Sequence, residues 1–149
     1  MNKKLILIAS IIIVLFGIGA VSAGFFDFLN FGDNSKDVSV VEDGQYCTVD
    51  EVSAYIKEFH KLPSNYITKS EARDLGWQGG PLKKYAPGKS IGGDTFTNRQ
   101  HVLPDSEDKY IECDINANGT SRGAERIVYN TGDYKVYYTE DHYNTFTEV

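Results

Sequence analysis

The second half of the chain is built of short runs in which apolar and polar side chains alternate, as they do along half-buried strands. The clearest run alternates Ile111, Cys113 and Ile115 with Glu112 and Asp114. An Asn-Gly turn and another apolar run follow it, which predicts an antiparallel hairpin. The strands expected in this half cover residues 90–95, 109–115, 125–130, 134–139 and 145–148.

The first half shows helical periodicity instead. Val52, Tyr55, Ile56 and Phe59 recur at positions i, i+3, i+4 and i+7 and form one apolar stripe. The stripe follows a capping box that starts at Thr48, so we expect a helix there that ends before Leu-Pro.

A second capping box from Thr68 to Glu71 predicts a shorter helix that ends at Gly76. The break at Gly79-Gly80-Pro81 predicts the start of a third short helix, with proline at its first position. Helices followed by an antiparallel meander are typical of the α+β class, with N-terminal helices packed on a twisted antiparallel sheet.

The N-terminus predicts export. A short basic region precedes an almost wholly apolar run, and Val21-Ser22-Ala23 resembles a small-residue cleavage site, so residues 1–23 are interpreted as a secretory signal peptide. The alternative is an uncleaved membrane anchor, since the apolar run is close to spanning length. We interpret residues 24–45 as a linker or pro-segment and residues 46–149 as one folded domain.

The charge balance is acidic, with 21 Asp and Glu against 15 Lys and Arg and a formal net charge of −6. Removal of the leader with its two lysines makes the remainder more acidic still. Long-range attraction to a polyanion is therefore weak, so any binding of phosphate needs a local basic cluster.

The hairpin offers such a cluster. If its strands pair as expected, Glu112 and Asp114 share one sheet face with Arg122 and Arg126. The arginines could bind a phosphate while one carboxylate serves as a base, and the alternative is a charge ladder on an exposed sheet. Lys69, in the first turn of the second helix, is disfavoured by the helix dipole unless an anion binds nearby.

Three blocks of sequence carry a resemblance to a known family. They are HKLPSNYITKSEA from His60, YAPGKSIGGDTFTNR from Tyr85 and TEDHYNTFTEV from Thr139. Together with the spacing of the hairpin residues, they make the chain from about residue 46 to residue 149 similar to the barnase-type extracellular microbial ribonucleases, a guanyl-preferring family. The resemblance implies a secreted, monomeric endoribonuclease with RNA as its substrate and a barstar-like inhibitor as a possible partner.

The resemblance also implies roles for individual residues. Glu112 matches the general base and His142 the general acid, and the phosphate clamp matches Lys69, Arg122 and Arg126. The residues that match the substrate-binding positions are Thr97, Asn98, Arg99, Gln100 and Tyr143. In the family a glutamate stands at the position of Gln100, so we expect weaker discrimination for guanine here.

The chemistry of the remaining residues agrees with this interpretation. An imidazole ionises near neutrality and suits an acid, and of the three histidines His142 is the best placed, because His60 ends a helix and His101 lies in a polar loop. None shows the close pair spacing of a zinc motif, so we expect no metal and no cofactor. The alternatives are a catalytically weak or inactive module of the same fold that binds RNA or a protein, a toxin with a cognate inhibitor, and a tyrosine-rich surface-binding domain.

Two cysteines complete the predictions. An exported chain with two cysteines favours one disulfide, between Cys47 and Cys113.

Overall fold

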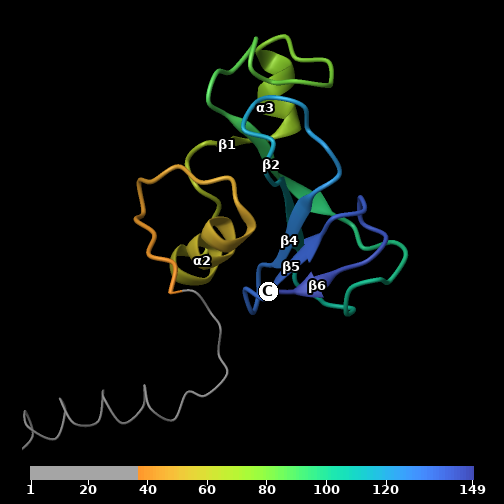
Figure 1. Ribbon diagram of the computed structural model, residues 1–149. Helices are drawn as coiled ribbons and strands as arrows, with labels where there is room; N and C mark the ends of the chain where they lie inside the picture. Colours follow the sequence, from red (N-terminus) through yellow and green to blue (C-terminus); the bar gives the residue numbers. More distant parts are fainter. Residues whose placement is uncertain (1–36) are drawn as a thin grey trace, which may run out of the picture. The chain divides into compact units, whose positions relative to one another are not determined.

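The computed structural model describes residues 37–149, which form one α+β unit (Figure 1). The predictions for the signal peptide and for residues 24–36 fall outside these residues. The elements, in chain order, are α2 (Val49–Phe59), β1 (Tyr66–Ile67), α3 (Lys69–Asp74), β2 (Ser90–Phe96), β3 (Tyr110–Asp114), β4 (Arg126–Asn130), β5 (Val136–Thr139) and β6 (Thr147–Glu148). The predicted fold class is confirmed.

The six strands form one sheet in the order β1 to β6. Neighbouring strands are antiparallel except for β1, which pairs in parallel with β2. The five strands expected from the sequence are present: β2 extends one residue further than expected, and the other four are shorter than expected. β1 was not predicted, because two residues are too short to show a period.

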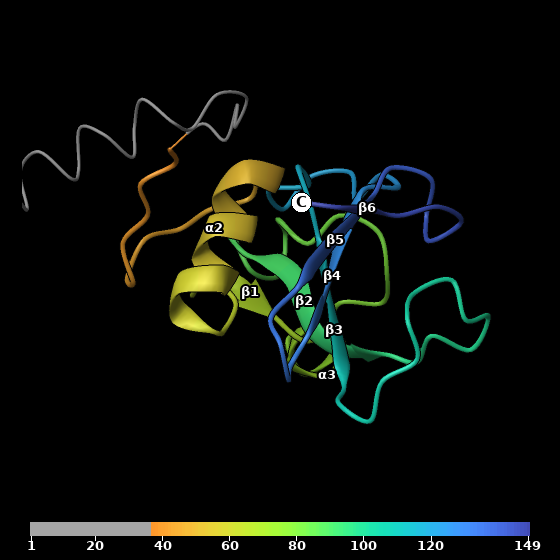
Figure 2. The same cartoon turned by 90° about the horizontal axis from the view of Figure 1, so that it is seen from below.

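Helix α2 covers one face of the sheet (Figures 1 and 2). It begins where the Thr48 side chain accepts a hydrogen bond from the backbone N–H of Glu51, and it ends at His60, which adopts the left-handed conformation with φ 58°. Val52 and Ile56 are fully buried. The predicted apolar stripe is therefore the side of α2 that packs on the strands.

Helix α3 has the predicted capping box, in which the Thr68 hydroxyl and the Glu71 carboxylate each accept from a free backbone N–H. The predicted third helix at Pro81 is wrong. The backbone N–H groups of Leu82 and Lys83 both donate to the Gly119 carbonyl, at 3.1 and 2.8 Å, so this segment is fastened to a distant loop and forms only a turn.

The register of the central strands separates an apolar face from a polar one. Cys113 lies opposite Ile127 on the face that α2 covers, and both side chains are in the main core. Asp114 lies opposite Arg126 on the other face, which Glu112 shares because it is two residues away on the same strand. Three of the four charges expected on this face are thus present there, and Arg122 lies in the loop before β4.

The disulfide prediction is wrong in this structure, where Cys47 and Cys113 are both free thiols. Cys113 is almost fully buried, and its thiol lies against the hydroxyl of Tyr66 in the core. Burial raises the pKa of the Cys113 thiol. The core around this strand is therefore held by packing without a covalent bridge.

Part of the expected linker packs on the domain. Val40 is buried, and the Tyr55 hydroxyl on α2 donates to the Glu42 carbonyl. Glu42 also forms an ion pair with Lys61 at 2.9 Å. Within residues 37–149, no helix is both long and apolar enough to cross a membrane.

Candidate active site

Glu112 lies at the middle of the polar sheet face. Its carboxylate accepts a hydrogen bond from the Lys69 ammonium at 3.1 Å, and only 14% of its side chain is exposed. The backbone N–H of Lys69 donates to Asp94, the cross-strand partner of Glu112, at 3.0 Å. The start of α3 is thereby fixed so that its lysine reaches the carboxylate.

Asp114 holds both predicted arginines. It accepts two hydrogen bonds from Arg122, at 2.7 and 3.0 Å, and the Arg126 Nε lies 3.0 Å from its carboxylate. Arg126 also donates to the backbone carbonyls of Arg122, Gly123 and Glu125. The hydrogen bonds that Arg122 donates to Asp114 raise the pKa of Arg122. Because two cations share one buried carboxylate, this group retains net positive charge.

Tyr143 joins Glu112 to the arginine group. Burial first, and then the negative charge of Glu112, raise the pKa of the Tyr143 hydroxyl, while the Arg126 guanidinium acts in the opposite direction. The ring is stacked on Phe96 of β2, with centroids 5.2 Å apart. Its hydroxyl therefore lies among the charged groups while its ring packs towards the neighbouring loop.

His142 sits on a tight turn after β5. Asp141 accepts from the Thr139 hydroxyl at 2.8 Å and from the Thr145 backbone N–H and hydroxyl at 2.9 and 2.5 Å. These hydrogen bonds lower the pKa of Asp141 to about 2. His142 has φ 55°, its N–H donates to the Ala124 carbonyl, and its side chain is exposed.

The predicted base-binding loop and His142 line one cavity of about 280 Å³. Asn98 fixes this loop, because its side-chain amide donates to the Leu103 carbonyl and accepts from the Leu103 N–H, at 2.9 and 3.0 Å. The residues around the cavity are Phe96, Thr97, Asn98, Arg99, Gln100, Val102, His142, Tyr143 and Asn144. Phe96 was not singled out from the sequence, although it directly precedes the predicted loop.

A second cavity, of about 640 Å³, opens beside α3. Lys69 and Arg122 line it together with Arg73 and Trp77, two residues that were not predicted to belong to the site. A signal for Arg73 was present, since it follows Lys69 by four residues and so lies on the same helix face. The structure thus joins Lys69, Glu112, Arg122, Arg126 and Tyr143 into one cluster, with a cavity beside it on each of two sides.

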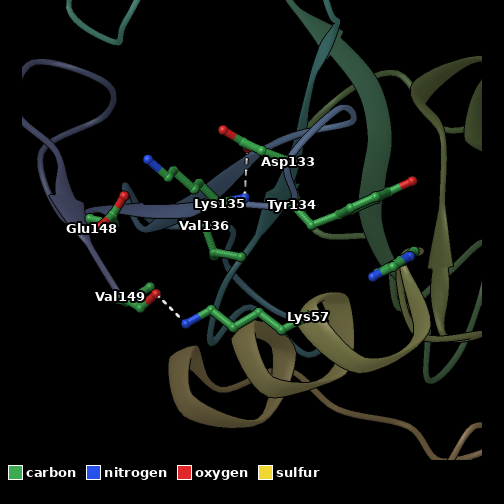
Figure 3. Close-up of a pocket in the computed structure, with 8 residues that line it drawn as sticks. Lys57, Asp133, Tyr134, Lys135, Val136, Glu148 and Val149 are labelled. Atoms are coloured by element: carbon green, nitrogen blue, oxygen red, sulfur yellow. Dashed lines mark hydrogen bonds between the residues drawn. The ribbon is translucent and has the colours of Figure 1, made fainter.

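A third cavity, of about 340 Å³, contains none of the predicted site residues (Figure 3). It lies at the end of α2, where Lys57 donates to the Val149 carbonyl, and where the His60 and Tyr134 rings stack in parallel with centroids 3.9 Å apart. His60 therefore has the structural role expected of it. No group of three potential metal ligands occurs among residues 37–149.

A carboxylate held against cations on one face of an antiparallel sheet, next to a cavity with an exposed histidine, is an arrangement suited to phosphate binding and acid–base chemistry. The family model described as "Ribonuclease" matches residues 49–149. The chain belongs to this ribonuclease family.

Individual relatives agree with the family model. The chain is 48% identical over 105 residues to a ribonuclease of Bacillus intermedius. The match covers 68% of this chain and 64% of the relative, so it spans just under two thirds of that protein. It is 47% identical to a ribonuclease of Heyndrickxia coagulans over 105 residues, or 68% of this chain and 95% of the relative. A shorter match, 43% over 56 residues, covers 36% of this chain and 54% of guanyl-specific ribonuclease St of Saccharopolyspora erythraea.

Proposed function

We propose that the protein is a metal-independent endoribonuclease that cleaves single-stranded RNA by transesterification. The ribose 2′-hydroxyl attacks the neighbouring phosphorus, which gives a 2′,3′-cyclic phosphate, and water then opens the ring to a 3′-phosphate. The observation that carries the proposal is the Glu112 carboxylate, which the Lys69 ammonium holds near the Tyr143 hydroxyl and on the same sheet face as Arg126.

Glu112 is the base in this scheme. The nucleophile is internal to the substrate, so the first step needs only a group that takes the proton of the 2′-hydroxyl. Glu112 is mostly covered yet keeps an open side, and its carboxylate lies 3.1 Å from the Lys69 ammonium. The open side is where the 2′-hydroxyl of a bound substrate would lie.

The cations stabilise charge that develops at phosphorus. Lys69, Arg122 and Arg126 are fixed in advance by Glu112, Asp114 and backbone carbonyls, so they do not have to reorganise when the substrate binds. Arg122 holds Asp114 through two parallel hydrogen bonds, a geometry that orients the guanidinium plane. His142 donates the proton that the departing 5′-oxygen requires.

The loop Thr97–Gln100 supplies the base site, and guanine is the proposed preference. Two observations support it: the loop shares a cavity with His142, and one matching relative is named guanyl-specific. The Asn98 side chain is occupied by Leu103, so the backbone of the loop is rigid and its Arg99 and Gln100 side chains are exposed towards the ligand.

Secretion is also proposed, on the basis of the leader sequence described above. The folded domain would act outside the cell as a monomer, and a cognate inhibitor of the barstar type would protect the producing cell.

The proposal is tested by incubating the protein with single-stranded RNA and with DNA of the same sequence in the presence of a chelator. RNA should be cleaved to products with cyclic-phosphate ends, and DNA should stay intact because it lacks the 2′-hydroxyl. If the chelator abolishes cleavage, or if DNA is cut equally well, the proposal fails.

Two variants test the assigned roles. Glu112→Gln and His142→Ala should each slow transesterification by about a hundredfold or more, because each removes one proton-transfer group. Glu148→Gln is the matched control, since this exposed glutamate on β6 lines the third cavity and should retain wild-type activity. Losses of only a few-fold in both site variants would favour a binding module over an enzyme.

A further inference from the structure

The α3 cavity, the space of about 640 Å³ bounded by Lys69, Arg73, Trp77 and Arg122, has no role in the proposed reaction. Two of its four named residues belong to the phosphate clamp, and the clamp also adjoins the base-binding cavity through Tyr143. An RNA strand whose base occupies that cavity and whose scissile phosphate meets the clamp therefore has an open space beside the clamp for its next segment.

Arg73 gives this space a distinct charge. It lies four residues after Lys69 on α3, so its guanidinium is on the same helix face, about 6 Å further along the axis. Within residues 37–149 it takes part in none of the ion pairs, whereas Lys69 and Arg122 are both paired with carboxylates. Its side chain is exposed, so its charge is available to a ligand.

We propose that Arg73 is a further substrate-binding residue, which contacts the backbone phosphate adjacent to the scissile one in the α3 cavity. The proposal rests on the proposed ribonuclease function. The spacing of Lys69 and Arg73 suits neighbouring phosphates, because a helical strand advances 3.4 Å per nucleotide and an unstacked strand advances further. Arg122 lines the same cavity, where it holds Asp114 and lies over the Trp77 ring at 5.6 Å.

RNA fits this space better than an acidic protein segment does. The cavity is continuous with the clamp that the reaction already requires, so a single strand can satisfy both with no second ligand. In a chain of net charge −6, binding of a polyanion also depends on local cations of this kind.

The test compares three substrates with the same guanine-containing dinucleotide core: the plain dinucleotide, the dinucleotide with an added 5′-phosphate, and the dinucleotide with an added 3′-phosphate. Values of kcat/KM are measured for the wild type, for Arg73→Gln and for Lys135→Gln. Lys135 is an exposed cation of the third cavity, so its variant controls for the loss of one positive charge.

One of the two added phosphates should raise kcat/KM of the wild type. Arg73→Gln should reduce that gain about tenfold, and kcat/KM on the plain dinucleotide, which lacks the adjacent phosphate, should stay the same. Which phosphate produces the gain identifies the side of the strand that the cavity holds. If Arg73→Gln slows all three substrates equally, or slows none, the inference is wrong although the ribonuclease function stands. If no substrate is cleaved, the proposed function itself fails. An effect of equal size in Lys135→Gln would show general charge attraction and would also overturn the inference.

Discussion

At the scale of single residues, the proposed function makes Gln100 the residue that decides how strictly the base is recognised. A glutamate carboxylate accepts hydrogen bonds from both the N1–H and the 2-amino group of guanine, whereas an amide has one acceptor oxygen and presents donors on its other side. Gln100 lines the base-binding cavity and is exposed. It is therefore the residue of this cavity at which specificity can be changed without disturbing the loop.

We predict that Gln100→Glu increases the preference for guanine over adenine by about tenfold or more, since a hydrogen bond to a charged group contributes roughly 1.5–3 kcal/mol. The measurement is the ratio of kcat/KM on dinucleotides with guanine or adenine at the 5′ position. The position of Arg99 should not change in the variant, because the hydrogen bonds between Asn98 and Leu103 fix the loop. An unaltered ratio would show that residue 100 does not contact the base.

The stability of the turn that carries His142 should depend on pH through Asp141. Its pKa is lowered from 3.8 to about 2, chiefly by the hydrogen bonds from Thr145. A carboxylate with a depressed folded-state pKa stabilises the protein fully above its unfolded pKa, and this stabilisation is lost as the pH falls towards 2.

Asp141→Asn should therefore reduce the loss of unfolding free energy between pH 5 and pH 2. The measurement is urea unfolding at a series of pH values. Asp74→Asn, at the end of α3, removes a carboxylate that lacks these hydrogen bonds and should keep the wild-type pH dependence. Identical slopes for all three proteins would contradict the assignment.

At the scale of elements, the features that could be predicted from the sequence are the local ones. The caps at Thr48 and Thr68 act within one helical turn, so their residues alone define where α2 and α3 begin. The prediction of a third helix was wrong because the backbone N–H groups of Leu82 and Lys83 donate hydrogen bonds to the Gly119 carbonyl. This contact joins distant segments, so no local pattern predicts it.

The same distinction holds for the site. Alternation placed Glu112 and Asp114 on one face, and the register confirms that Arg126 lies opposite Asp114. The contact of Lys69 with Glu112 crosses from α3 to β3 and was not predicted, because the family resemblance indicated only that both residues belong to one site. Arg73 and Trp77 were missed because their importance depends on the shape of the loop after α3, which is rich in glycine.

The segment before α2 behaves as part of the domain. Val40 is 7% exposed, whereas its neighbour Val41 is 57% exposed, and the Glu42 carbonyl accepts from Tyr55 on α2. The segment contacts the helix that covers the face opposite Glu112, so its packing leaves the candidate active site open.

We predict that Val40→Ala lowers the free energy of unfolding by about 1.5 kcal/mol, at about 0.8 kcal/mol per buried methylene, while Val41→Ala changes it by less than about 0.5 kcal/mol. Chemical denaturation of both variants measures the difference, and RNA cleavage should be the same in both. Equal stabilities would mean that the segment is not docked in solution. Higher activity after Val40→Ala would indicate instead that the segment inhibits the enzyme.

At the scale of the whole molecule, the charges are segregated. The chain carries a net charge of −6, yet Lys69, Arg73, Arg122 and Arg126 are gathered around α3 and the polar sheet face. Attraction to RNA is therefore expected mainly in this region. Binding should weaken only moderately with added salt, because the salt dependence grows with the number of phosphates neutralised and few cations are available here.

The stability of the whole domain rests on its core, and Cys113 reports on that core. The residue is 1% exposed, lies within the main cluster between α2 and the sheet, and has a pKa raised by burial. Because the thiolate is the reactive form, the Cys113 thiol is protected as long as the core is intact. Cys47 is only partly buried and is not joined to it.

We predict that unreduced protein shows two free thiols per chain when denatured, and that reductant leaves the midpoint of unfolding unchanged. In the Cys47→Ser variant under native conditions, the Cys113 thiol should react only at the rate of global unfolding, because it is buried in the main core. The labelling rate is followed with a thiol reagent and compared with the rate of unfolding.

If the denatured wild type shows no free thiols, and if reduction lowers the free energy of unfolding by about 2–5 kcal/mol, the two cysteines form a disulfide after all. Fast labelling of the Cys47→Ser variant would show that the core opens locally at β3, well before the domain unfolds.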